Sequence, residues 1–365
     1  MPKVESKPDF QQAAARHMAW WDGSSIGGRP AVSVFHIPKP GAPAAPADPR
    51  PRDQKEADPA FFVNLFDHNL RAYEYPAETM PAVWVLYADN VCFAPALAGA
   101  EVEYRPDTTW VKPRPDIYEI PTPAFDRRHP VFTRLLAIQN RLIERFADRG
   151  VLSPPVLMDG MTALSLFRDS GPLCLDLLDR PADVQRVSQA LDRLSLDAHA
   201  AFFEPLRKAG HDHTVTWAGI YSQGKAEMVQ CDFGVMLSPA MYDEFAMPGL
   251  RLVTEYMDRS CYHLDGTCQC RFLDLLASLP RLHAIQWNPE PGAAPVTEWL
   301  GFFKDVRRKK LSLWAVCSTP AEAVYLTRHL GPDGLMLVVK GVKSLPEVDR
   351  LLVELTQAGS EFTGL

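Results

Sequence analysis

Residues able to bind a metal or move a proton recur where short apolar runs of the sequence end. These residues are Asp159, Asp232, His263, Asp265 and Cys317. His263 and Asp265 are alternate residues of one run, so in a strand their side chains point to the same side. Imidazole, carboxylate and thiolate are all zinc ligands, and three protein ligands leave the open position that catalytic zinc requires. The pattern predicts a metal centre held by His263, Asp265 and Cys317.

The other residues at these run ends have candidate roles of their own. Cys231 or Asp232 could complete the metal shell, Asp232 could also act in catalysis beside Asp265, and Asp159 and Trp287 are candidates for substrate binding. Cys317 precedes a helix start at Thr319, whose positive end would lower the thiol pKa. Each residue also has a structural alternative, because strand-end histidines are often simply hydrogen-bonded, Asp265 could cap a helix, and Trp287 could be buried core.

The elements that would position these residues alternate between apolar runs and longer helical segments after Gly150. The predicted strands are VLMD (156–159), MVQCD (228–232), CYHLD (261–265), LHAIQW (282–287), LSLWAV (311–316) and LMLVV, which ends at Val339. Alternation of this kind predicts a parallel sheet covered by helices on both faces. No glycine-rich dinucleotide fingerprint or phosphate loop is present, which favours a closed (β/α)8 TIM barrel over an open nucleotide-binding sheet.

The N-terminal part has a different composition. Seven prolines fall between residues 38 and 59, which predicts an extended surface segment. An apolar stripe predicts a helix over 132–149, ended by Gly150. We expect one domain over 1–365, with residues 1–150 forming an N-terminal cap around the rim and residues 151–357 the main part of the barrel.

Composition and charge narrow the class of protein. The 365 residues carry a formal charge of −7, which argues against nucleic-acid binding. No apolar run of about 18 residues predicts a membrane span, and the N-terminus does not resemble a signal peptide, so we expect a cytoplasmic location. Seven cysteines, an odd number, do not suggest a disulfide framework.

Four ordered segments resemble the uroporphyrinogen decarboxylase superfamily, and they are closest to its zinc-dependent corrinoid methyltransferases. The segments are MVQCDFGVMLSPAMYDEFAMPGL, CYHLDGTCQCRFLDLLASLPRLHAIQW, LSLWAVCSTPAEA and LMLVVKG. The resemblance covers roughly residues 60–355, and an upstream stretch, APALAGAEVEYRPDTTWVKP, is also similar to that branch. It implies a (β/α)8 barrel with the N-terminal segments packed around the rim.

The resemblance also implies a metal site and a reaction. Methyltransferases of this superfamily hold zinc with a His-x-Cys pair and a later Cys, which correspond here to His263, Asp265 and Cys317. Aspartate at the middle position makes the site harder, so another transition metal is an alternative to zinc. The implied reaction moves a methyl group between a corrinoid, free or on a partner corrinoid protein, and a small thiol or other acceptor. A homodimer is compatible with the resemblance.

Of the two reactions of the superfamily, the sequence favours methyl transfer over porphyrinogen decarboxylation. Decarboxylases of the superfamily bind substrate carboxylates through an arginine-containing segment after Pro-Val-Trp, whereas here Pro81-Ala82-Val83-Trp84 continues without arginine to Asp89 and Asn90. Two alternatives remain open: an enzyme with a redox metal such as copper or iron on the same scaffold, and a non-catalytic protein that binds a small ligand.

Overall fold

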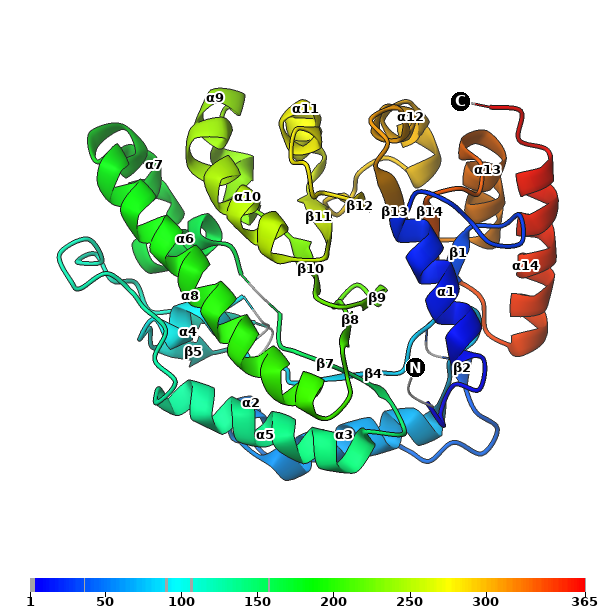
Figure 1. Cartoon of the computed structure of the whole chain (residues 1–365), viewed down its shortest axis with the longest axis horizontal. Helices are drawn as coiled ribbons and strands as arrows, with labels where there is room; N and C mark the ends of the chain where they lie inside the picture. The colour runs from blue at the N-terminus through cyan, green and yellow to red at the C-terminus, as the bar shows by residue number, and fades with distance from the viewer. Residues whose placement is uncertain (1–3, 36, 89–90, 106–107, 157, 365) are drawn as a thin grey trace.

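The central sheet has six parallel strands in the order β1–β14–β13–β12–β11–β10 (Figure 1). The computed structural model describes residues 4–35, 37–88, 91–105, 108–156 and 158–364. The strands are β1 (Ala31–Ser33), β10 (Ala226–Val229), β11 (Arg259–Asp265), β12 (Ala284–Asn288), β13 (Ser312–Cys317) and β14 (Leu335–Val339). The predicted α/β class with a parallel sheet is therefore confirmed.

Smaller strand pairs accompany this sheet. β4 (Ala82–Trp84) and β7 (Val151–Ser153) are parallel, and the hairpin of β8 (His213–Val215) and β9 (Tyr221–Gln223) is antiparallel. β8 contacts both β7 and β10, so it lies between the parallel pair and the central sheet. Two further antiparallel pairs are β2 (Ile37–Pro38) with β3 (Tyr73–Glu74) and β5 (Val102–Tyr104) with β6 (Thr109–Val111).

Helices surround the strands in Figure 1. They are α1 (Phe10–Trp21), α2 (Arg52–Glu56), α3 (Pro59–Ala72), α4 (Phe93–Leu97), α5 (Pro130–Phe146), α6 (Gly160–Arg168), α7 (Ser170–Asp179), α8 (Pro181–Lys208), α9 (Pro239–Met241), α10 (Met247–Tyr256), α11 (Leu273–Ala277), α12 (Leu300–Arg308), α13 (Pro320–Leu330) and α14 (Leu345–Ser360). α5 confirms the helix predicted over 132–149. Within the described ranges, none of the helices combines the length and apolar character needed to cross a membrane.

The two faces of the sheet pack against different partners. Trp20 and Trp21 of α1 lie in one buried cluster with alternate strand residues such as Met228 and Cys261. The indole Nε1–H of Trp20 donates to the carbonyl oxygen of Leu313 at 3.0 Å, which ties the helix to β13. The opposite face belongs to the larger core, whose members include residues of the outer helices.

Three sequence expectations need correction. The strand predicted at 156–159 is instead β7 at Val151–Ser153, followed by two prolines, which cannot donate to a ladder, and Leu157 of the predicted strand lies outside the described residues. The segment 38–59 is not extended throughout, because α2 forms within it and α3 begins at Pro59. Residues 1–150 are more than a cap, since β1 belongs to the central sheet.

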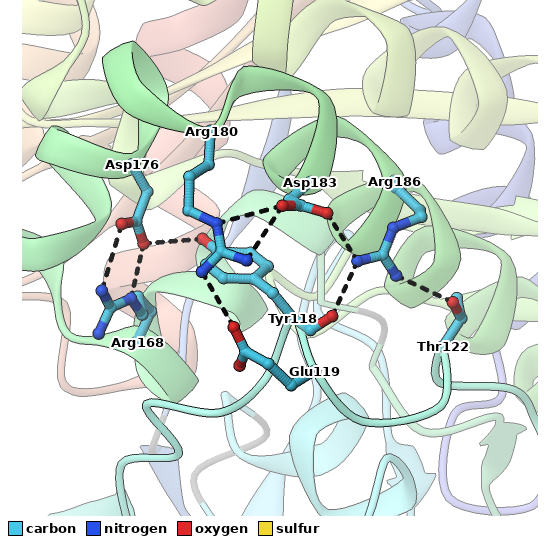
Figure 2. A network of polar contacts seen from close by, with 8 residues as sticks. All are labelled: Tyr118, Glu119, Thr122, Arg168, Asp176, Arg180, Asp183 and Arg186. Carbon is cyan, nitrogen blue, oxygen red and sulfur yellow. Dashed lines mark hydrogen bonds and ion pairs between the residues drawn. The ribbon is translucent and has the colours of Figure 1, made fainter.

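A network of arginines and carboxylates fixes the segment around residues 118–122 to α7 and α8 (Figure 2). The Asp176 carboxylate accepts hydrogen bonds from Tyr118 Oη at 2.9 Å and from Arg168 Nε at 2.6 Å. Arg186 donates to the carbonyl oxygen of Tyr118 at 3.1 Å and to Asp183 at 2.9 Å. Asp176 is buried, so these hydrogen bonds replace those that its carboxylate would make to water.

Candidate metal centre

Three predicted site residues meet at the carboxyl ends of two neighbouring strands. Asp232 opens the 3₁₀ turn that follows β10, while His263 and Asp265 are the third-last and last residues of β11. One ligand atom from each lies within 4.8 Å of those of the other two. They come together because β10 and β11 are parallel neighbours whose ends share one edge, and because strand alternation directs residues 263 and 265 to the same side.

His263 is held in one orientation by its neighbour across the sheet. β11 and β12 pair His263 with Gln286, and His263 Nδ1 lies 2.6 Å from Gln286 Oε1. Because Oε1 is an acceptor, Nδ1 carries the proton and Nε2 keeps its lone pair. Nε2 lies 3.8 Å from Asp265 Oδ1, and the Trp217 ring meets the imidazole edge-on at a centroid distance of 5.0 Å. A metal-ligating histidine has this arrangement, with the second ring nitrogen hydrogen-bonded.

Asp265 lies on the solvent side of the group. Its side chain is 44% exposed, whereas that of His263 is 11% exposed. Asn288, the residue paired with it on β12, donates from Nδ2 to Asp265 Oδ1 at 2.8 Å. Asp265 therefore has a fixed carboxylate while the group stays open to solvent on this side, where a substrate could approach.

Asp232 is a half-buried carboxylate whose Oδ1 atom is fully buried. Burial raises its pKa to about 6, with His263 opposing the rise and Asp265 adding to it. Gln230 Nε2 donates to Asp232 Oδ2 at 3.1 Å, but Oδ1 is buried and has no hydrogen-bond partner among the described residues. A buried, unpaired carboxylate oxygen is costly unless a cation or proton satisfies it, so the group fits a divalent cation.

Asp159 lies near this group without joining it. Its side chain caps α6 by accepting from the backbone N–H of Thr162 at 2.8 Å. Burial, followed by the charge of Asp232, raises the pKa of Asp159 well above the ordinary value. Its other oxygen, Oδ2, is buried without a partner in the described part of the chain. Capping of α6 accounts for the position of Asp159 Oδ1 but not for the unpaired Oδ2. The substrate-binding role predicted for Asp159 stays a prediction.

Cys317 does not join the metal-binding group. The strand register pairs His263 with Gln286 and Gln286 with Trp314. Cys317 lies three residues after Trp314, an odd number, so alternation directs its side chain to the opposite face. There it is fully buried in the larger hydrophobic core, and burial raises the pKa of its thiol, which is opposite to the lowering expected from the helix start.

Side-chain alternation along β12 also directs Trp287 away from the site. It is adjacent to Gln286 and therefore lies on the outer face, where only 1% of the residue is exposed. Its ring packs against those of Trp299 at 4.6 Å and of Phe302 and Phe303, each at 5.5 Å. The structure does not support Trp287 as a wall of the substrate site and instead places it in the core between β12 and α12.

Sequence reasoning assigned no role to three residues that shape the site. Gln286 and Asn288 share the face of His263 on the adjoining strand, and Trp217 reaches His263 from the turn between β8 and β9. Gln286 and Asn288 are alternate residues of the run AIQWN, so their side chains point to the same side of the strand. This alternation is the sequence pattern that could have predicted both residues at the site. No local sequence pattern predicts the contact of Trp217 with His263, because the turn that contains Trp217 is distant from β11 in the sequence.

Comparison with known proteins gives no family assignment. No protein-family model matches the chain, and no curated protein matches it.

Proposed function

We propose that the protein is a metal-dependent methyltransferase of the uroporphyrinogen decarboxylase type, acting between a corrinoid and a small acceptor. The observation that carries the metal-dependent part is the convergence of Asp232, His263 and Asp265 within 4.8 Å. The methyl-transfer part rests on the sequence resemblance. In this proposal the six strands of the central sheet and the β4–β7 pair are the eight strands of one (β/α)8 barrel, and their carboxyl ends surround the site, the usual position for barrel chemistry.

The donor set supports this proposal through its charge. The superfamily's set of one histidine and two cysteinates carries two negative charges, and His263 with Asp232 and Asp265 carries the same total. Zinc accepts nitrogen and carboxylate oxygen, although harder donors also suit other divalent transition metals. Asp232 and Asp265 thus replace the two thiolates without changing the charge around the cation.

The residues have separable roles in this mechanism. His263, oriented by Gln286, and the carboxylates of Asp232 and Asp265 would hold the cation. When bound, such a cation would lower the pKa of a coordinated thiol or hydroxyl, so that the acceptor is deprotonated near neutral pH. Trp217 covers one edge of His263 and limits water there, while exposed Asp265 marks the open approach.

A protein partner would approach from the same side. Val235 and Met236 follow Asp232 in the turn after β10 and are 41% and 52% exposed. Apolar side chains at the edge of a site suit a transient partner such as a corrinoid protein.

Metal analysis of tag-free protein tests the proposal first. We expect one equivalent of zinc, lost in His263→Ala. An equivalent of copper or iron would favour the redox enzyme, and a metal-free wild-type protein that cannot be reloaded would favour a binding protein.

The metal-loaded protein should then demethylate methylcobalamin in the presence of small thiols under anaerobic conditions. Failure with every thiol, despite full metal loading, would count against methyl transfer.

A further inference from the structure

The turn that carries Asp232 begins without a cap of its own. Asp232 is the first residue of a 3₁₀ turn that runs to Met236, and its N-cap residue, Cys231, makes no side-chain hydrogen bond to the turn. The first backbone N–H groups of a helical turn have no partner within that turn, so they need an acceptor from outside it. Phe233 is buried, which makes an unpaired N–H at this point costly.

Thr162 of α6 supplies the missing acceptor. Its Oγ1 accepts a hydrogen bond from the backbone N–H of Asp232 at 2.9 Å and a longer one from that of Phe233 at 3.4 Å. Thr162 is itself buried, so water competes little for these bonds. One hydroxyl group, 70 residues earlier in the sequence, thus caps the turn that presents Asp232 to the metal-binding group.

Thr162 is held in place by the way in which α6 begins. Its backbone N–H donates to Oδ1 of Asp159, the N-cap residue of α6, at 2.8 Å. The backbone N–H of Gly160 donates to Asp192 Oδ1 of α8 at 2.7 Å, and a Cβ at Gly160 would collide with the carbonyl oxygen of Ser188. This close packing of α6 on α8 leaves Thr162 little freedom to move.

We propose that Thr162 is a positioning residue of the metal centre: its cap aligns the Asp232 carboxylate with the other two metal-binding side chains. The direction of the Asp232 side chain follows from its backbone, which the cap fixes. Valine at position 162 would have a similar volume but no acceptor, so two N–H groups would lose their partner and the turn would shift. The effect on metal affinity rests on the proposed function, whereas the cap is present with or without a cation.

Zinc affinity, measured by competition with a chromophoric chelator, tests the proposal. We expect Thr162→Val to bind zinc about 10-fold more weakly than wild type, the usual scale for losing a group that supports a metal ligand. Thr162→Ser keeps the hydroxyl and should stay within about threefold of wild type. If Thr162→Val does not fold, Thr162→Ala removes the same acceptor without an added methyl group, and the same loss is expected.

Thr327→Val is the matched control. It also replaces a buried helical threonine, but the Thr327 hydroxyl donates to the carbonyl oxygen of Ala323 in its own helix, at 2.8 Å. This variant should keep zinc affinity within about twofold of wild type. A loss as large as that in Thr162→Val would attribute the effect to general stability and overturn the proposal.

The visible spectrum of the cobalt-loaded protein reports the ligand set directly. At full loading, Thr162→Val should alter the ligand-field bands, because Asp232 no longer reaches the cation in the same geometry. Thr162→Ser and Thr327→Val should both give the wild-type spectrum. A spectrum of Thr162→Val identical to that of wild type would show that the cap does not position Asp232.

Hydrogen exchange of the metal-free protein, followed by NMR, tests the cap alone. The amides of Asp232 and Phe233 should exchange about fivefold faster in Thr162→Val, the scale of one lost hydrogen bond, and should be unchanged in Thr327→Val. Equal exchange rates in wild type and folded Thr162→Val would overturn the proposal. Faster exchange with unchanged zinc affinity would refute the positioning role and leave the metal centre standing. Wild-type protein that binds neither zinc nor cobalt would instead refute the proposed function, and the positioning role with it.

Discussion

His263 Nδ1 and Gln286 Oε1 lie 2.6 Å apart, on residues that the strand register places opposite each other. This contact determines which imidazole nitrogen is available, because the proton on Nδ1 leaves the Nε2 lone pair for a metal. The orientation of the His263 imidazole is thus set by a residue on a different strand.

We predict that Gln286→Leu weakens metal binding by about 10- to 100-fold, the usual cost of losing a group that orients a ligating histidine. Gln286→Glu keeps an acceptor facing Nδ1 and should retain most of the affinity. Competition with a chromophoric chelator measures both variants. Equal affinities for Gln286→Leu and wild type would show that the hydrogen bond does not orient a ligand.

The position of Cys317 gives a second prediction. His263→Ala should lose the metal, whereas Cys317→Ala should keep full occupancy and lose only stability, about 1 kcal/mol for a small cavity in the core. Mass-spectrometric metal analysis after dialysis, paired with urea unfolding, distinguishes the two effects. Loss of metal in a folded Cys317→Ala protein would restore Cys317 to the ligand set.

Asp192 should make stability depend on pH. Burial raises its pKa to about 7, with the backbone N–H of Gly160, 2.7 Å from Oδ1, and the charge of Arg193 opposing the rise. Between about pH 4 and 7 the unfolded chain has lost this proton while the folded protein retains it, so rising pH favours unfolding. The contribution of protonated Asp192 to stability is complete below about pH 4 and is lost as the pH passes 7.

The test compares wild type with Asp192→Asn, which keeps an acceptor for Gly160. From pH 5 to pH 8 the stability of wild type should fall relative to the variant, by an amount on the order of 2–4 kcal/mol. Urea unfolding at several pH values measures the difference. A difference independent of pH would mean that Asp192 has an ordinary pKa in the folded protein.

Removing Asp176 should release the segment around residues 118–122. Asp176→Ala leaves Arg168 and Tyr118 without their shared acceptor, and we expect a loss of about 2–4 kcal/mol together with faster proteolysis in this segment. Asp305→Ala breaks an exposed pair with Arg308 and should cost less than about 1 kcal/mol. Equal costs for both variants would contradict a structural role for the network.

The sequence was most informative where hydrophobic pattern and capping chemistry act locally. Runs such as CYHLD and LSLWAV form strands near the predicted bounds, and the helix start expected at Thr319 is present, where Thr319 and Glu322 form a capping box. β1 was missed because three residues carry too little periodicity to be distinguished from a loop.

The site was predicted only in part because position at a strand end does not determine the face. His263 and Asp265 converge with Asp232 as their spacing and strand order allow. Cys317 and Trp287 end neighbouring strands but point outward, which follows from register, a property of two strands together. Trp217 was inaccessible to local reasoning, since its contact with His263 depends on tertiary packing.

The pairing of β1 with β14 has a consequence for how the protein is made. Residues 31–33 hydrogen-bond to residues 336–338, so one edge of the sheet is completed by chain segments from opposite ends of the sequence. A ribosome must extend the chain past residue 338 before β1 can pair completely with β14, and contacts of such long sequence separation form slowly. During translation the unpaired β1 is an exposed strand edge that chaperones or neighbouring chains could bind.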